Sequence, residues 1–125
     1  MIFMVYIGAV IAIAWGVAHI VATKPVIKGF GRLSFDNQRI LAMEWIAEGI
    51  SLCFIGLLVV LTVIWGQPGD ALVRIILRMS ALVLAVFAGL AVFTGARTSQ
   101  IPFRICPFIE MGAGVLILIG SYSFG

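Results

Sequence analysis

The chain contains few charged residues. Asp, Glu, Lys and Arg make up 10% of its 125 residues, whereas soluble domains carry about 25%. Hydrophobic residues account for 63%, and the mean hydropathy is +1.24. A chain this apolar would precipitate from water, so the lipid bilayer is its expected solvent and partner. The formal net charge of +3 is small and its basic residues are scattered, which argues against a nucleic-acid partner.

Histidine and cysteine are almost absent, and this excludes several kinds of metal and redox site. His19 is the one histidine, and there is no Glu-x-x-His motif, so a di-iron carboxylate site and a bis-histidine haem are excluded. Cys53 and Cys106 form no Cys-x-x-Cys pair, and their expected depths in the membrane differ by about 15 Å, which argues against a disulfide. A zinc site from His19, Cys106 and a glutamate is compatible by ligand type. Because no spacing selects it, we assign neither a metal nor a cofactor from the sequence.

Catalytic motifs are missing as well. The chain has no glycine-rich phosphate loop and no recognisable nucleophile motif, which argues against phosphoryl and acyl transfer. Whether the protein is an enzyme therefore stays open at this stage.

Long apolar runs, in contrast, are abundant. Four of them are long enough to cross about 30 Å of hydrocarbon as helices, at residues 2–23, 41–65, 75–95 and 105–124. The first run lacks a basic start and stays apolar too long for a signal peptide. The sequence therefore predicts an all-α integral membrane protein with a single domain, residues 1–125, built as a bundle of four transmembrane helices.

Local signals refine the expected helix ends and contacts. Asp36 or Asn37 is expected to cap the second helix, and Pro107 is expected in the first turn of the fourth. Rows of small residues predict close helix contacts in the bilayer; they comprise Gly8, Ala12 and Gly16 on the first helix, Gly49, Cys53 and Gly56 on the second, Ala81, Ala85 and Gly89 on the third, and Gly112 and Gly114 on the fourth.

The basic residues predict an orientation. Six of them belong to the first and third connections and the adjoining helix ends, against two at the second: Lys24, Lys28, Arg32, Arg39, Arg97 and Arg104 against Arg74 and Arg78. Short cytoplasmic loops are enriched in Lys and Arg. We therefore expect a multi-pass protein of the plasma membrane, or the inner membrane if the source is bacterial, with both termini outside.

Ionisable residues gather in the cytoplasmic half of the predicted bundle. His19, Glu44, Glu48, Arg97 and Glu110 all fall there, and Glu44 and Glu48 are one helical turn apart on the same helix face. Two carboxyls that close can share a proton. Ionisable groups at membrane depth usually face the bundle interior and mark functional sites, so we predict that these five side chains form a ligand-binding pocket.

Two kinds of function fit this pocket. In the first, it binds or acts on a small or lipidic molecule. In the second, the protein is a non-catalytic membrane subunit, or a proton-coupled carrier that works as a homo-oligomer. A structural alternative also exists, in which Arg97 pairs with Glu44 or Glu110 and only ties helix ends together.

Two stretches carry a local resemblance. “AWGVAHIVA” and “DNQRILAMEWIAEG” resemble helices of the sterol-isomerase and sigma-2-receptor group, in which a histidine and acids line a pocket among the membrane helices. The resemblance is confined to these stretches, and the later acidic motifs of that group are missing. No residue role is assigned from it.

Overall fold

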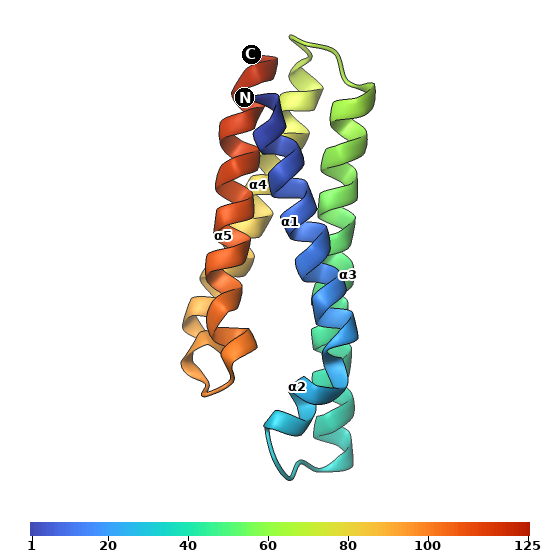
Figure 1. Cartoon of the computed structure of the whole chain (residues 1–125), viewed down its shortest axis with the longest axis vertical. Coiled ribbons are helices and arrows are strands. Elements are labelled where there is room, and N and C mark those ends of the chain that lie inside the picture. Colours follow the sequence, from blue (N-terminus) through green and yellow to red (C-terminus); the bar gives the residue numbers. More distant parts are fainter.

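The computed structural model describes residues 1–125 and contains helices and connecting turns but no strand. The five α-helices and two 3-10 turns are α1 (Ile2–Val21), α2 (Thr23–Gly29), α3 (Phe35–Trp65), α4 (Ala71–Phe93), η1 (Gly95–Arg97), α5 (Ile101–Ser121) and η2 (Tyr122–Phe124) (Figure 1). All the α-helices except α2 are long and apolar enough to cross a membrane. The prediction of an all-α, multi-pass membrane protein with four spans is confirmed.

The first connection is more structured than expected. It contains α2, and α3 begins at Phe35 rather than at residue 41. The cap of α3 is Ser34, whose hydroxyl accepts a hydrogen bond from the Asn37 amide at 3.2 Å; the expectation of Asp36 or Asn37 was wrong, because both lie within the first turn. With 31 residues, α3 is about 46 Å long and exceeds what the hydrocarbon requires.

The prediction for Pro107 was also wrong. Helix α5 begins at Ile101, so Pro102 occupies its first turn, where a missing N–H has no cost, and Pro107 lies inside the helix. Pro107 cannot donate the usual helical hydrogen bond to the Phe103 carbonyl. The interruption falls next to Cys106, which is part of the site described below.

The helices form two antiparallel hairpins, α1 with α3 and α4 with α5. Helix α1 packs against both α3 and α5, and α4 packs mainly against α5, whereas α3 and α4 touch much less. Both termini lie at one end of the bundle, which we call the terminal end (Figure 1). The other end, formed by residues 22–34 and 94–100, is called the loop end.

Small residues allow the backbones to come close. A methyl group added to Gly8 would lie 2.7 Å from the Ala113 carbonyl oxygen, and one added to Gly16 would lie 2.5 Å from that of Gly49. These contacts join α1 to α5 and α1 to α3, as the rows of small residues predict. Gly89 and Gly112 differ from the prediction, because no atom lies within 4 Å of an added methyl group.

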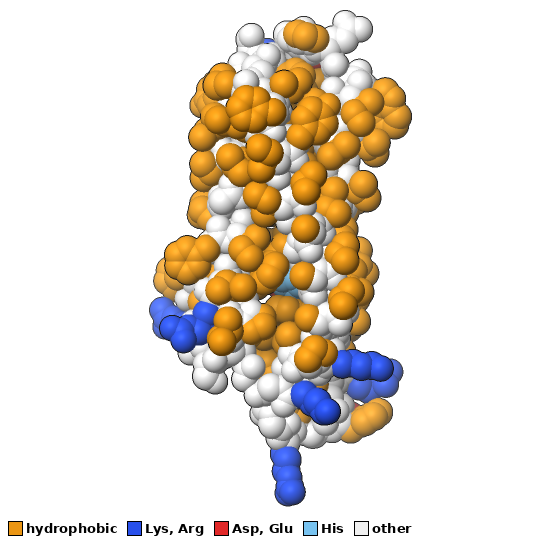
Figure 2. Space-filling model, in the orientation of Figure 1, with side chains coloured by type: hydrophobic (Ala, Val, Ile, Leu, Met, Phe, Trp, Pro, Cys, Tyr) orange, Lys and Arg blue, Asp and Glu red, His pale blue; other side chains and the backbone are white.

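The outer surface matches a lipid environment. Apolar side chains cover most of the face shown in Figure 2, and the visible Lys and Arg side chains gather toward the loop end. Large exposed apolar residues occur on all four long helices, for example Phe54 on α3 and Phe108 on α5. A soluble protein would bury such residues, whereas a membrane protein presents them to acyl chains.

Candidate functional site

The centre of the site is His19, held in a fixed orientation near the loop end of α1. It is 1% exposed, and its Nδ1 lies 2.9 Å from the Trp15 carbonyl oxygen, one turn earlier. Since a carbonyl can only accept, Nδ1 carries the proton, which leaves Nε2 of the neutral ring as a lone-pair donor. The ring stacks on Trp45 with centroids 4.0 Å apart and meets the edge of Trp15.

Two side chains from other helices approach Nε2 of His19. The Sγ atom of Cys106, on α5, lies 3.7 Å from it, and Oε2 of Glu48, on α3, also lies 3.7 Å from it. One ligand-type atom from each of these three residues lies within 4.8 Å of the other two. Cys106 and Cys53 are both free thiols, in agreement with the absence of a disulfide expected from the sequence.

Glu110 follows Cys106 by one turn of α5 and is the most enclosed acid of the site. It is 1% exposed, and neither carboxyl oxygen has a hydrogen-bond partner. Its carboxyl adjoins that of Glu48, with which it can share a hydrogen bond, and lies near the thiol of Cys106. The only other buried side-chain polar atoms without partners are the indole nitrogens of Trp15 and Trp45. Every unsatisfied buried side-chain group of the chain therefore borders this one cluster.

A cleft opens beside the cluster, between α3, α4 and the start of α5. It has a volume of about 460 Å³, and its acidic side chains are Glu44 and Glu48. Apolar residues such as Phe87 and Phe103 complete its walls, and no basic residue lines it. Glu44 is exposed in the cleft and Glu48 is half-buried, so the two predicted neighbours lie on one face of α3.

The cleft continues toward the terminal end as an apolar groove between α3 and α4. The groove has a volume of about 590 Å³ and shares Ser51 and Phe87 with the cleft. Its walls are formed by apolar side chains that include Phe54 and Met79. Cleft and groove together have an acidic end and an apolar end.

Arg97 does not join the other predicted site residues. It is exposed in η1, and its guanidinium lies 5.7 Å from the centre of the Phe93 ring. The one contact between a basic and an acidic side chain in the chain is that of His19 with Glu48, so Arg97 pairs with neither Glu44 nor Glu110.

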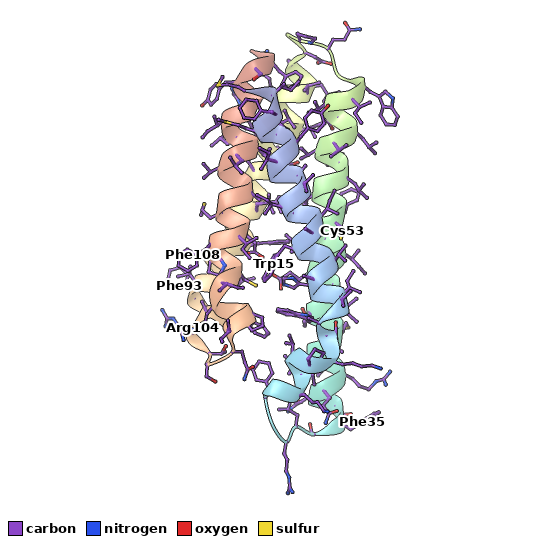
Figure 3. All side chains as sticks on the ribbon, in the orientation of Figure 1. Trp15, Phe35, Cys53, Phe93, Arg104 and Phe108 are labelled. Atoms are coloured by element: carbon purple, nitrogen blue, oxygen red, sulfur yellow. The ribbon has the colours of Figure 1, made fainter.

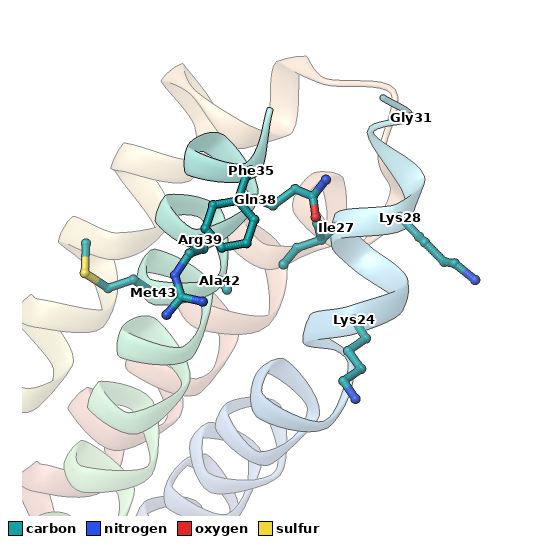
Figure 4. A pocket seen from close by; sticks show the side chains of 9 residues that line it. All are labelled: Lys24, Ile27, Lys28, Gly31, Phe35, Gln38, Arg39, Ala42 and Met43. Carbon is teal, nitrogen blue, oxygen red and sulfur yellow. The ribbon is translucent and has the colours of Figure 1, made fainter. Parts of the chain in front are cut away.

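A separate basic hollow lies at the loop end between α2 and α3 (Figure 4). It has a volume of about 720 Å³, and its charged side chains are Lys24, Lys28 and Arg39, with Phe35 beside them. It contains no acid. This hollow is distinct from the acidic cleft and shares no residue with it.

Aromatic residues complete the site in a way that the sequence analysis did not predict. Trp45 is buried between His19 and Phe103, and its ring lies 4.5 Å from that of Phe103. Trp15 lies between α1 and α5 in Figure 3. Helical spacing could have predicted both tryptophans, because Trp15 precedes His19 by four positions and Trp45 precedes Glu48 by three. Residues at these spacings lie on the same face of a helix.

No protein-family model, curated protein or solved structure matches this chain.

Proposed function

We infer that this membrane protein binds a small lipophilic cation, such as an amphiphilic amine, with its positive group at Glu44 and Glu48 and its apolar part in the groove between α3 and α4. The observation that carries this proposal is the pair of carboxyl side chains in a cleft without any basic residue. The sequence predicted a small or lipidic ligand of unspecified charge, and this proposal specifies that the ligand is positively charged.

Charge complementarity supports a cation rather than an anion. Glu44 has no ion-pair partner, and the only ion-pair partner of Glu48 is His19. Ionised carboxylates near hydrocarbon are costly unless a positive group or water accompanies them. A bound cation supplies that group, whereas an anion would be repelled by both acids.

The shape of the cavity supports an amphiphile. Ligand sites usually have volumes of roughly 300–1,000 Å³ and apolar walls with few polar groups, and the cleft, at about 460 Å³, lies within this range. The adjoining groove is almost entirely apolar. An apolar tail placed there would replace lipid contacts, while the cationic group would face the acidic end.

Orientation follows from the basic residues of the loop end. We place this end on the cytoplasmic side, with both termini outside, because short cytoplasmic loops favour Lys and Arg. A thiol-blocking reagent that cannot cross membranes should then label Gly125→Cys but not Gly31→Cys in intact cells. The opposite labelling pattern would show that the protein has the reverse orientation in the membrane.

Binding can be tested with two ions of similar shape and opposite charge. The purified protein, in nanodiscs of neutral phosphatidylcholine, is dialysed against radiolabelled tetraphenylphosphonium or tetraphenylborate. We expect saturable binding of the phosphonium only, and loss of at least about 90% of it in Glu44→Gln/Glu48→Gln, since two of the attractive charges are removed.

The control variant is Asp36→Asn, which removes an exposed acid from the first turn of the same helix but leaves the cleft unchanged. It should bind the phosphonium as the wild type does. Equal binding of both ions, or unchanged binding in the double variant, would contradict the proposal. The protein could instead form an oligomer through the α3–α4 groove and lose phosphonium binding when it does so. That result would favour the alternative of a membrane subunit.

A further inference from the structure

We propose that His19, Cys106 and Glu48 bind a zinc ion at the inner wall of the cleft, with the buried carboxyl of Glu110 beside them. This metal site goes beyond the binding of a lipophilic cation and does not depend on it. The sequence assigned no metal, because the three residues are far apart in the chain and come together only when α1, α3 and α5 pack.

The distances fit tetrahedral coordination. With usual Zn–S and Zn–N bond lengths, a cysteine sulfur and a histidine nitrogen on one zinc ion are about 3.5 Å apart. Here Sγ of Cys106 and Nε2 of His19 are 3.7 Å apart, and Oε2 of Glu48 lies 3.7 Å from the same nitrogen. These two separations are within a few tenths of an ångström of those around one zinc ion, and all three ligand-type atoms lie within 4.8 Å of one another.

The orientation of His19 is the one that a metal ligand requires. In metal sites the second ring nitrogen of a histidine usually donates to a carbonyl or carboxylate, which fixes the ring and its tautomer. Nδ1 of His19 has this role through the Trp15 carbonyl at 2.9 Å, and stacking on Trp45 holds the plane of the ring. Nε2 therefore faces Cys106 and Glu48 with its lone pair.

Glu110 supplies an independent indication of a ligand. Buried polar groups almost always have hydrogen-bond partners, and an exception needs an explanation. Glu110 is 1% exposed and has no basic partner, and its carboxyl adjoins that of Glu48, with which it can share a hydrogen bond, and the thiol of Cys106. A cation bound by the three neighbouring residues would offset the charge of this buried carboxyl.

The donor set favours zinc among the common metal ions. Thiolate and imidazole ligands suit zinc, whereas magnesium and calcium prefer sites made of oxygen atoms alone. The Cys106 thiolate and one carboxylate would balance the two positive charges of the ion. Cys106 and Glu48 also line the cleft, which gives the ion a path to His19.

The test uses cobalt as a spectroscopic substitute for zinc. The full chain is purified with a tag that contains no histidine, and Co²⁺ is added in detergent. We expect a thiolate-to-cobalt charge-transfer band that Zn²⁺ abolishes, at about one ion per chain. The matched variants are Cys53→Ser, which should keep the band, and Cys106→Ser, which should lose it and weaken zinc binding at least about tenfold.

A second matched pair is Glu48→Gln and Glu44→Gln, of which only the first should weaken zinc binding. The proposal would be overturned if folded wild-type protein showed no charge-transfer band, or if Cys53→Ser lost the band. Neither of these outcomes depends on whether Cys106→Ser folds. Zinc binding that is unchanged in folded Cys106→Ser would overturn it too. Because Glu44→Gln affects only the lipophilic cation, failure of the two proposals can be distinguished.

Discussion

The terminal and loop halves of the bundle are packed by different means. Toward the terminal end, α1 and α5 touch backbone to backbone, with Gly8 against the Ala113 carbonyl and Gly120 against Val5. Toward the loop end, α1 stays close to α3, but the side chain of Trp15 lies between α1 and α5 (Figure 3). His19 there reaches Cys106 of α5, with 3.7 Å between Nε2 and Sγ. Small residues thus close one half, and large aromatic or polar side chains keep the other half apart.

The two halves also differ in the groups that they bury. The terminal half is an apolar core whose buried residues include Val5, Ala9 and Ile117. The loop half contains the cleft, the unsatisfied indoles and the buried acid. Close packing leaves no space for a ligand, so a binding site forms only where the helices are held apart.

Gly8→Leu should cause the largest loss of stability. Even a methyl group at Gly8 would lie 2.7 Å from the Ala113 carbonyl oxygen, so the larger side chain must push α1 and α5 apart. We expect a loss of about 3 kcal/mol, measured by unfolding in mixed micelles. Gly112→Leu, on α5 with no atom within 4 Å of an added methyl group, is the control and should change stability by less than about 0.5 kcal/mol. Equal effects would refute the proposed contrast in packing.

Glu110→Met should stabilise the metal-free protein. The change replaces a buried carboxyl without hydrogen-bond partners by an apolar side chain of similar length. Comparable replacements of buried ionic groups are neutral or stabilise by about 1–4 kcal/mol, and we expect about 2 kcal/mol in the same unfolding assay. The exposed Glu44→Met should show no such gain. A marked loss of stability in Glu110→Met would show that this acid has a structural role.

Gln100→Ala should loosen the loop end. The Gln100 amide donates a 2.7 Å hydrogen bond to the Gly29 carbonyl, which links the two connections at this end. Its loss should cost about 1 kcal/mol and speed hydrogen exchange at the amides of α2. Gln67→Ala, in the turn between α3 and α4, makes no side-chain hydrogen bond to lose and should leave that exchange unchanged. Unaltered exchange in Gln100→Ala would mean that other contacts hold α2.

Arg97→Gln should have the smallest effect. The exposed guanidinium contacts only the face of Phe93, and such a contact contributes about 0.5–1 kcal/mol at most. If Arg97 instead balanced a buried acid, the substitution would cost about 3 kcal/mol or more, and adding Glu110→Gln would restore stability. The unfolding free energies of the single and double variants decide between these cases.

The number and type of the helices could be predicted because hydrocarbon allows few alternatives. A chain in lipid must satisfy every backbone hydrogen bond within itself, so each long apolar run becomes a helix. Helix ends were harder to predict, because Ser34 and Pro102 lie where helices meet polar connections, and this constraint is absent there. The short helix α2 was missed for the same reason.

The candidate site was only partly accessible from the sequence. Depth and helical spacing placed His19 and Glu48 in the same half, but which atoms meet depends on how each helix rotates and crosses its neighbours. The sequence placed Arg97 with the acids because it falls in the same half of the bundle, but α4 ends at Phe93 and Arg97 lies in η1. Cys106 and His19 are 87 positions apart in the chain, and no local sequence pattern predicts a contact between residues so far apart.

The arrangement in two hairpins has a consequence for biogenesis. His19 and Glu48 enter the membrane with the first hairpin, and Cys106 and Glu110 enter with the second. Membrane helices form before they associate laterally, so neither hairpin alone contains the complete site. The site is therefore a late product of assembly, and any defect that keeps the second hairpin from docking on α1 would eliminate it while leaving every helix inserted.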